Sequence, residues 1–441
     1  ASIKDGTKTI FHQEVEVPSF WSQNATDIVA QHYFKVVNGE KETSVKQCVS
    51  RVSKAFSKAG IKNGYFDKEV GRTFERELRW LLVHQYICFN SPVWYNLGVE
   101  KEGQLSACFI QSVKDSIESL CQLQTNETML FRNGSGTGTN FSTLRELAAP
   151  LSNGGSSSGP VSFVKGFDTW AGITKSAGKT RRAAKMVILN VDHPDIEDFI
   201  KSKVTVEKMA RDLIKMGWPA DYNSETYSFL PYQNANHSVR VTDDFMRAVE
   251  QDKNFDLINF KKIKVKELSA KNLFRTIAEA AHLCADPGIQ FDTTINSWHT
   301  SPNSGRINAA NPCSEYMFVD DSACNLASHN LVKYYKDREF NIEAFVKATE
   351  ITITAMEIAV AISSYPTKEI AENSKRLRPL GIGWANGGAL LMRMGLPYDS
   401  DKGRFWLSSI TSLLTASAYF WSAKIAELCG GPFEDCEKNK T

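Results

Sequence analysis

Three side chains capable of chemistry alternate within one short segment, Asn311-Pro312-Cys313-Ser314-Glu315. In an extended strand alternate side chains point to the same face, so the spacing predicts an amide, a thiol and a carboxylate on one surface, roughly 6–7 Å apart between neighbours. Such a set could hold a hydroxyl group, release a hydrogen atom from sulfur and act as a general base. The simpler interpretation is a polar turn that begins at Asn-Pro, with Cys313 as a small core residue.

Two further cysteines change the balance between these interpretations. Cys324 follows in the segment 322–328, and Cys108 stands about two hundred residues earlier in the segment 105–110. Together with Asn311-x-Cys313-x-Glu315 they resemble the catalytic subunit of ribonucleotide reductases. In that family an Asn-x-Cys-x-Glu strand end carries a radical cysteine, and two remote cysteines form a redox pair. The resemblance extends from about residue 80 to the last residue, with several motifs in the family's order.

The resemblance implies a role for each of these side chains in converting a ribonucleotide into a 2′-deoxyribonucleotide. Cys313 would carry a thiyl radical that abstracts the 3′-hydrogen of the substrate. Glu315 would deprotonate the 3′-hydroxyl group, and Asn311 would hold that group in place. Cys108 and Cys324 would supply the reducing hydrogens and become a disulfide, which a thioredoxin-like protein would reduce again.

The segment 89–98 resembles the one that opens the barrel of cobalamin-dependent (class II) reductases, and this implies adenosylcobalamin as the radical source. By family position Ser91, Ala107 and Arg181 are expected to bind the ribonucleotide. One alternative is the large subunit of a class I reductase, which uses a separate radical-generating subunit. Another is a catalytically inactive regulator that binds deoxynucleotides, although the retained cysteines and Glu315 argue against it.

A regulatory site is also implied. In the family an acid at this distance after the first redox cysteine binds a deoxynucleoside triphosphate effector, and Asp115 occupies that position, with Ser116 and Arg145 as expected partners. From its residues alone, Asp115-Ser116 is more simply the cap of a helix that extends to Met129. The flexible segment 151–160 and the basic segment 177–185 match the family's specificity loops, and the effector would bind where two copies of a homodimer meet.

Composition and charge exclude several other classes of protein. The 441 residues are 42% hydrophobic and 23% charged, with a formal net charge of +2, which argues against a dedicated nucleic-acid-binding protein. No long uncharged apolar run predicts a membrane span, and the first residues lack the apolar region of a signal peptide. Nine irregularly spaced cysteines without a Cys-x-x-Cys pair favour a reducing cytoplasm and no structural metal site.

The elements that must position these residues alternate between strands and helices, which favours an α/β fold. We expect a helical N-terminal region over residues 1–85 and a catalytic α/β barrel domain over residues 86–441, and the family's barrel has ten strands. Expected strands include 105–113, 186–190 and 233–241, the last with its amides facing the cavity. Expected helices include 243–250, 270–283, 342–364, 380–396 and 401–429, whereas the glycine-rich segment 132–140 is expected to be a loop.

The family's C-terminal third has no counterpart in this sequence. Reductases continue with a Pro-Thr phosphate-binding loop, further barrel strands and a cysteine-bearing tail, so the barrel is expected to be incomplete in this chain. Either a second polypeptide completes it, or the last helices of the chain pack into the gap. We favour the first alternative, because the loop that fixes the substrate phosphate is also absent.

Overall fold

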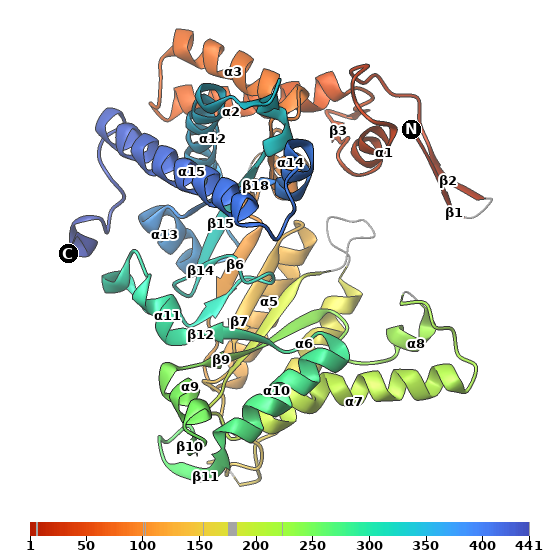
Figure 1. Cartoon of the computed structure of the whole chain (residues 1–441), viewed down its shortest axis with the longest axis vertical. Coiled ribbons are helices and arrows are strands. Elements are labelled where there is room, and N and C mark those ends of the chain that lie inside the picture. Colours follow the sequence, from red (N-terminus) through yellow and green to blue (C-terminus); the bar gives the residue numbers. More distant parts are fainter. Residues whose placement is uncertain are drawn as a thin grey trace. The chain divides into compact units, whose positions relative to one another are not determined.

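The computed structural model describes residues 1–5, 8–99, 101, 103–152, 154–174, 183–222 and 224–440. The contacts between residues divide the chain into two compact units, which are described separately. Unit 1 comprises Ala1–Ala107, Cys324–Tyr365 and Ala371–Glu434, and unit 2 comprises Cys108–Ala323, Pro366–Ile370 and Asp435–Thr441. Each unit therefore combines segments that lie far apart in the sequence (Figure 1).

Unit 2 is built on five parallel strands in the order β12-β9-β8-β7-β6. Helices connect successive strands, as parallel pairing requires. The strands are β6 (Cys108–Gln111), β7 (Gly136–Asn140), β8 (Lys185–Asn190), β9 (Ala235–Val241) and β12 (Gly288–Phe291). The helices are α5 (Ile117–Arg132), α6 (Gly159–Ile173), α7 (Ile196–Lys215), α8 (Glu225–Ser228), α9 (Asp243–Glu250), α10 (Ala270–Cys284) and α11 (Asp292–Ser297).

The glycine-rich segment forms strand β7, so the expectation of a loop over 132–140 is wrong. The reason is a close approach by a second element. A Cβ atom on Gly138 would collide with the carbonyl oxygen of Ala310, and one on Gly136 would lie 2.6 Å from Cγ of Pro312. Glycine is therefore required because another piece of backbone lies directly against this strand, and this contact outweighs the low strand propensity of glycine.

The two faces of this sheet differ in character. One face packs against α5, α6, α7, α9 and α10 through a continuous apolar core, in which Val187, Leu189 and Val239 are buried. A buried ion pair between Lys185 of β8 and Glu127 of α5 also lies there. The side chains at the alternate positions, which include Asn140, Asn190 and Asn236, belong to the opposite face. The polar contacts of the candidate site are made on this second face.

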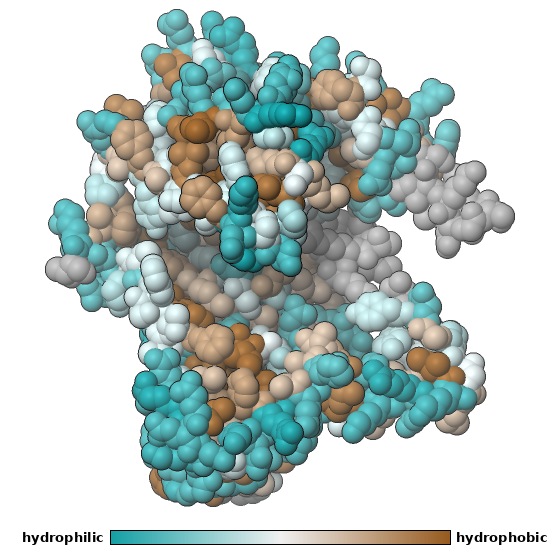
Figure 2. All heavy atoms as spheres, in the orientation of Figure 1, coloured by the Kyte–Doolittle hydropathy of each residue, from teal (hydrophilic) through white to brown (hydrophobic). Residues whose placement is uncertain are grey.

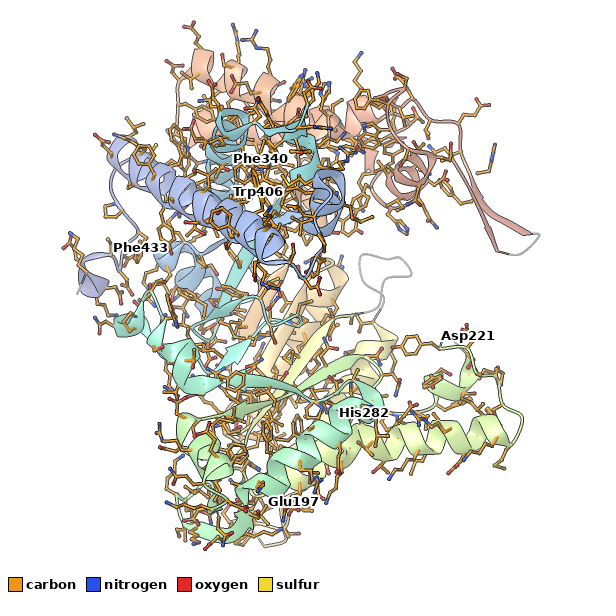
Figure 3. The ribbon with its side chains drawn as sticks, in the orientation of Figure 1. Glu197, Asp221, His282, Phe340, Trp406 and Phe433 are labelled. Atoms are coloured by element: carbon orange, nitrogen blue, oxygen red, sulfur yellow. The ribbon has the colours of Figure 1, made fainter. Side chains whose placement is uncertain are left out.

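A two-stranded hairpin extends from this unit between α9 and α10. It consists of β10 (Asn254–Ile258) and β11 (Lys264–Ser269), which pair antiparallel. Most of β11 is exposed, and hydrophilic side chains dominate this region at the lower left of Figure 2. Lys266 of β11 pairs with Glu197 near the start of α7, the glutamate labelled in Figure 3.

Unit 1 contains a shorter sheet under a helical layer. Strand β15 (Ser322–Asn330), which belongs to this unit from Cys324 on, pairs parallel with β18 (Leu380–Ala385) and antiparallel with β5 (Ile87–Phe89). Its helices are α1 (Gln23–His32), α2 (Val45–Lys62), α3 (Lys68–Val83), α4 (Ser91–Asn96), α12 (Ile342–Ile362), α14 (Gly387–Met394) and α15 (Asp401–Leu428). Short hairpins are formed by β1 (Ser2–Asp5) with β2 (Lys8–His12), β3 (Val36–Val37) with β4 (Glu40–Lys41), and β16 (Tyr335–Lys336) with β17 (Glu339–Phe340), and α13 (Lys368–Leu377) has residues in both units.

The core of unit 1 lies between α2, α3, α12 and the sheet. Phe340, labelled in Figure 3, packs at its edge, whereas Trp406 of α15 is partly exposed. The expected helix over 380–396 is wrong in its first part: the Gly-Ile-Gly-Trp segment forms β18, and α14 begins only at Gly387. Parallel pairing with β15 supplies the backbone partners that a strand of small residues needs.

The α/β class is confirmed, together with a helical N-terminal region. The expected helices 243–250, 270–283, 342–364 and 401–429 are confirmed to within two residues at each end. Within the part of the chain that the structure describes, no helix has both the length and the apolar character that crossing a membrane would require.

Candidate active site

The Asn-Pro-Cys-Ser-Glu segment forms the tip of a hairpin in unit 2. Strands β13 (Ala309–Ala310) and β14 (Met317–Phe318) pair antiparallel on either side of it. The Asn311 amide donates to the carbonyl of Tyr316 at 3.3 Å, and the Ser314 amide donates to the carbonyl of Asn311 at 3.2 Å. The expectation that the segment is an extended strand is therefore wrong.

Ser314 explains why the segment turns. Its φ of 64° lies in the left-handed region, which few residues other than glycine adopt. The alternation of side chains along a strand consequently does not apply from Asn311 to Glu315. Cys313 and Glu315 are exposed, whereas Asn311 is buried with 1% of its surface accessible.

The fold nevertheless brings three of the five expected catalytic residues into direct contact. The Asn311 side-chain amide donates to Sγ of Cys108 at 3.0 Å, and the Cys108 thiol donates to Oε1 of Glu315 at 3.3 Å. The Oδ1 atom of Asn311 accepts the amide of Tyr316 at 3.0 Å, which fixes the orientation of the side chain. Cys108 is the first residue of β6, so strand and hairpin tip meet at this point.

The sheet holds the tip by polar contacts from its second face. The side chain of Asn236 in β9 donates to the carbonyl of Pro312 at 2.8 Å, and that of Gln290 in β12 donates to Oγ of Ser314 at 3.1 Å. Both residues bracketing Cys313 in the sequence are therefore held by hydrogen bonds. The approach of the hairpin to Gly136 and Gly138 adds close backbone packing on the β7 side.

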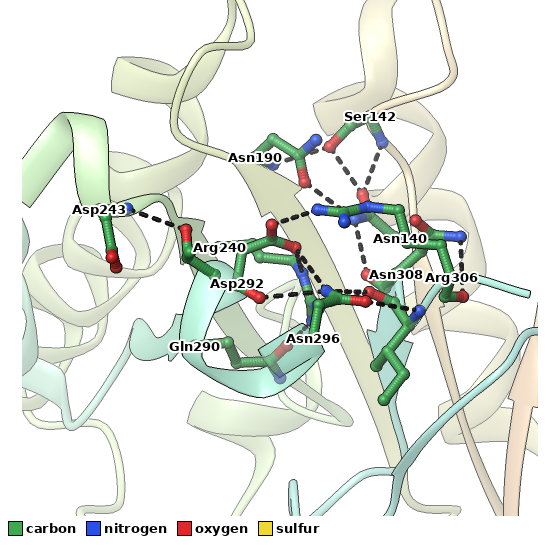
Figure 4. A network of polar contacts seen from close by, with 12 residues as sticks. Asn140, Ser142, Asn190, Arg240, Asp243, Gln290, Asp292, Asn296, Arg306 and Asn308 are labelled. Atoms are coloured by element: carbon green, nitrogen blue, oxygen red, sulfur yellow. Dashed lines mark hydrogen bonds and ion pairs between the residues drawn. The ribbon is translucent and has the colours of Figure 1, made fainter. Parts of the chain in front are cut away.

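The base of the hairpin is anchored by a second set of polar residues, shown in Figure 4. Asn140 donates to the carbonyl of Asn308 at 2.9 Å, and Arg240 donates to the carbonyl of Ile307 at 2.6 Å. Asn308 also donates to Oδ2 of Asp320, which follows the hairpin, at 2.9 Å. Burial raises the pKa of Asp320 to about 6. This anchor lies against a polar cavity of about 580 Å³ at the carboxyl ends of β7, β8 and β9.

Cys324 lies in the other unit, in β15. It is buried, and its thiol donates to the carbonyl of Asn325 at 3.3 Å. A Cβ atom on Gly381 of β18 would collide with Cδ2 of Leu326 and lie 3.0 Å from the sulfur of Cys324, so glycine leaves room for both side chains. The pairing of Cys324 with Cys108 remains a prediction.

The expected effector residues of unit 2 also come together. The guanidinium group of Arg145 donates to Oδ2 of Asp115 at 2.6 Å, and the two side chains are only partly exposed. Ser116 is the N-cap of α5, because its hydroxyl oxygen accepts the amide of Ser119. Asp115 therefore is not the capping residue and has a side chain engaged by an arginine. Arg145 also lies over the ring of Phe260, 5.3 Å from its centroid, in the turn of the β10–β11 hairpin.

The expected substrate-binding residues are less well defined. Ser91 is the first residue of α4, and its hydroxyl lies 3.0 Å from that of Tyr33. Ala107 is half-buried, and its amide donates to the carbonyl of Cys324 at 3.2 Å. Arg181 lies outside the described residues, as does most of the segment 177–185.

Sequence reasoning missed Gln290 and Arg240. Arg240 is a charged residue between Val239 and Val241 of an expected strand, and this is the signal that could have identified it. Gln290 carries no comparable signal, since its contact depends on which strands are neighbours. His237 of the same strand as Arg240 is buried in a stack with Phe199, 4.8 Å between ring centroids.

Comparisons with known proteins identify the family of the chain. The model of the ribonucleotide reductase barrel domain matches residues 106–441, and that of the class II vitamin B12-dependent ribonucleotide reductase matches residues 1–85. The chain therefore belongs to the ribonucleotide reductase family.

Several curated relatives share sequence along nearly the whole chain. The chain is 49% identical to a vitamin B12-dependent ribonucleotide reductase of Streptomyces coelicolor, over 99% of the chain and 46% of the relative. Proteins of the same name from Rhodopirellula baltica and Bradyrhizobium diazoefficiens are 46% and 36% identical, over 98% and 99% of the chain. The chain spans about half the length of these relatives, 45% and 46% for the last two.

Proposed function

We propose that this chain carries the thiyl-radical site of an adenosylcobalamin-dependent ribonucleotide reductase, which converts ribonucleotides into 2′-deoxyribonucleotides. The observation that carries the proposal is the hairpin tip. It presents an exposed Cys313 beside a hydrogen-bonded group of Cys108, Asn311 and Glu315. The family match over residues 1–85 favours the cobalamin-dependent class over a class I large subunit.

The reaction begins at Cys313, whose thiol gives up a hydrogen atom and becomes a thiyl radical. The thiyl then takes the 3′-hydrogen of the ribose, and Glu315 accepts the proton of the 3′-hydroxyl group. The amide of Asn311 is held by Tyr316 and Cys108, and it would hold the 3′-oxygen from this fixed position. Orientation of this kind is the main contribution that a protein makes to a radical step.

The two remaining cysteines supply the reducing hydrogens. As the 2′-hydroxyl group leaves as water, one hydrogen from the Cys108–Cys324 pair completes the water and the other is transferred to the 2′-carbon, while the two sulfurs form a disulfide. Cys313 then returns a hydrogen atom to the 3′-carbon, and Glu315 returns the proton to the 3′-oxygen. The hydrogen bond from the Cys108 thiol to Glu315 offers a direct path for a proton between the two groups. A thioredoxin-like dithiol protein would then reduce the disulfide.

Adenosylcobalamin fits the exposure of Cys313. The cysteine side chain lies at the surface of the hairpin tip, so a radical source bound outside the hairpin can reach the sulfur. When bound, the cofactor supplies a carbon-centred radical that accepts a hydrogen atom from a thiol. The protein's share is to hold Cys313 in place.

The effector site is proposed at Asp115, Ser116 and Arg145, at the interface of a homodimer. A carboxylate can accept a hydrogen bond from a ribose hydroxyl, and an arginine can bind a phosphate bidentately.

Ser91, Ala107 and Arg181 remain proposed contacts of the ribonucleotide. We also propose that the protein is located in the cytoplasm, because its nine irregularly spaced cysteines suit a reducing compartment.

The function is tested by assaying the 441-residue chain with adenosylcobalamin, a dithiol reductant and each ribonucleotide, with deoxynucleotides measured by chromatography. We expect cobalamin-dependent formation of deoxynucleotides that is lost in Glu315→Gln and retained in Asp212→Asn, a control at an exposed position of α7. Equal product with and without adenosylcobalamin would contradict the assignment to this class.

A further inference from the structure

The backbone around Cys313 is held in a costly conformation. Ser314 follows Cys313 directly and has a left-handed backbone with a φ of 64°, which costs a residue other than glycine free energy. Such a conformation persists where neighbouring groups fix it. The hydroxyl oxygen of Ser314 accepts a hydrogen bond from the side-chain amide of Gln290 at 3.1 Å.

Arg240 determines which way the Gln290 amide faces. The guanidinium group of Arg240 donates to Oε1 of Gln290 at 3.1 Å, and arginine has no acceptor atom. The oxygen of the Gln290 amide must therefore face Arg240, and its NH₂ group must face Ser314. Gln290 is buried, with 3% of its surface accessible, and sits between a cation and the loop.

Arg240 is itself fixed on the other sides. Its Nε donates to Oδ1 of Asp292 at 2.5 Å, and its Nη2 donates to the carbonyl of Ile307 at the base of the hairpin. Figure 4 shows Asp292 between Arg240 and Arg306. Asp292 forms an ion pair with Arg306 as well as with Arg240. One arginine thus holds the base of the hairpin directly and its tip through Gln290.

We propose that Gln290 is a positioning residue for Cys313, locked by Arg240 and acting through Ser314. The inference rests on the proposed role of Cys313, but the contact that Gln290 makes is with the neighbouring residue of the turn. Its function is to keep the turn in the conformation that sets the place and direction of the thiol. Through the hydrogen bonds from Arg240 to Gln290 and from Gln290 to Ser314, the position of the thiol depends on the pairing of β9 with β12.

Three variants separate positioning from simple packing. Gln290→Leu keeps the approximate volume and removes both hydrogen bonds. Ser314→Ala removes the same bond from the loop side and leaves the sheet untouched. Gln290→Glu is the conservative variant, because one carboxylate oxygen can accept a hydrogen bond from Arg240 while the other accepts one from the Ser314 hydroxyl group.

The readouts are the alkylation rate of Cys313 by iodoacetamide as a function of pH and the hydrogen exchange of the Ser314 and Tyr316 amides, both measured by mass spectrometry. In Gln290→Leu and Ser314→Ala we expect both rates to rise about fivefold, as for the loss of one hydrogen bond. Gln290→Glu should stay close to wild type. Alkylation of the exposed Cys121 of α5 and exchange in β8 should not change, which would show an intact fold.

Wild-type rates in Ser314→Ala, or equal changes in Gln290→Leu and Gln290→Glu, would overturn the inference. Ser314→Ala provides this answer even if Gln290→Leu does not fold. The measurements need no nucleotide or cofactor. A chain that reduces no ribonucleotide would therefore count against the proposed function alone, whereas unchanged alkylation would count against the positioning role alone.

Discussion

The three cysteines of the proposed mechanism have different surroundings, which suit the different tasks proposed for them. Cys313 is exposed at a hairpin tip, where an external radical source can reach it. Cys108 is buried and engaged by Asn311 and Glu315, and Cys324 is buried in a strand. A buried thiol that contacts a carboxylate is suited to proton and hydrogen transfer, and an accessible thiol to radical generation.

At the proposed effector site, Asp115→Asn removes the charge that pairs with Arg145 while keeping the size of the side chain. We expect binding of the cognate deoxynucleoside triphosphate to weaken about tenfold or more, as for the loss of a charge-assisted hydrogen bond. The measurement is titration calorimetry with each deoxynucleoside triphosphate. Asp212→Asn, which changes an exposed carboxylate of α7, is the matched control and should bind as the wild type does.

Affinities that are unchanged in Asp115→Asn would show that the effector binds elsewhere. Binding lost to the same extent in both variants would indicate a general effect of charge and would also count against this site.

The contact of Cys108 with Asn311 and Glu315 agrees with the grouping that the sequence predicted, but the local geometry was not predictable. Asn311, Cys313 and Glu315 were expected on one face of a strand. They lie instead on a turn, because Ser314 adopts a left-handed conformation that could not be predicted from its residue type. Gln290 and Arg240 were missed, since only the pairing of β9 with β12 places them side by side, and this pairing joins residues about fifty positions apart.

At the scale of elements, helices were predicted well and glycine-containing strands poorly. The helices at 243–250 and 342–362 both begin after a capping side chain, and the first also has apolar residues at helical spacing, which are local signals. Strands β7 and β18 contain glycines for tertiary reasons: β7 lies against the hairpin, and β18 leaves room beside Cys324. A glycine required by a distant contact cannot be distinguished in the sequence from a glycine required by a turn.

The contact between β7 and the hairpin predicts the effect of adding one methyl group. Gly138→Ala places a Cβ atom against the Ala310 carbonyl, so the hairpin must shift. We expect a loss of about 1–3 kcal/mol in the free energy of unfolding, as for an overpacked core, measured by urea denaturation.

The control for this variant is Gly166→Ala. Gly166 lies on an exposed face of α6, where a Cβ atom would have no neighbouring atom within 4 Å. The same substitution there should be neutral or stabilising by about 0.5–1 kcal/mol, because alanine favours helix. Equal stability of Gly138→Ala and wild type would show that the hairpin does not lie against β7 as described.

At the scale of the whole molecule, the α/β class and the family were predictable because the cysteine motifs follow the family's order. The division of contacts into two units was not, since unit 1 joins the first 107 residues to segments after Cys324. Such long-range assembly depends on the pairing of β15 with β5 and β18, which no local pattern encodes.

Stability against acid provides a prediction for the whole chain. His329 is buried between Tyr334 and Thr349, and burial lowers its pKa to about 3 from 6.5. The folded chain keeps this imidazole neutral, whereas the unfolded chain binds a proton below pH 6.5. The free energy of unfolding should therefore fall as the pH decreases from 6.5 towards 3, by about 1 kcal/mol per pH unit from this group.

His329→Asn should reduce that slope in urea denaturation across the same pH range. His282→Gln, at an exposed position of α10 labelled in Figure 3, should leave it unchanged. Identical slopes for His329→Asn and wild type would show that the buried imidazole does not contribute to acid sensitivity.

The central claim is that Cys313 at the hairpin tip carries the radical that attacks the ribose. The most direct measurement is the release of tritium to water from a ribonucleotide labelled at the 3′-carbon, with adenosylcobalamin present, by the wild-type chain, Cys313→Ser and Cys121→Ser. We expect release by wild type and Cys121→Ser and none above background by Cys313→Ser. Release by Cys313→Ser at the wild-type rate would contradict the claim.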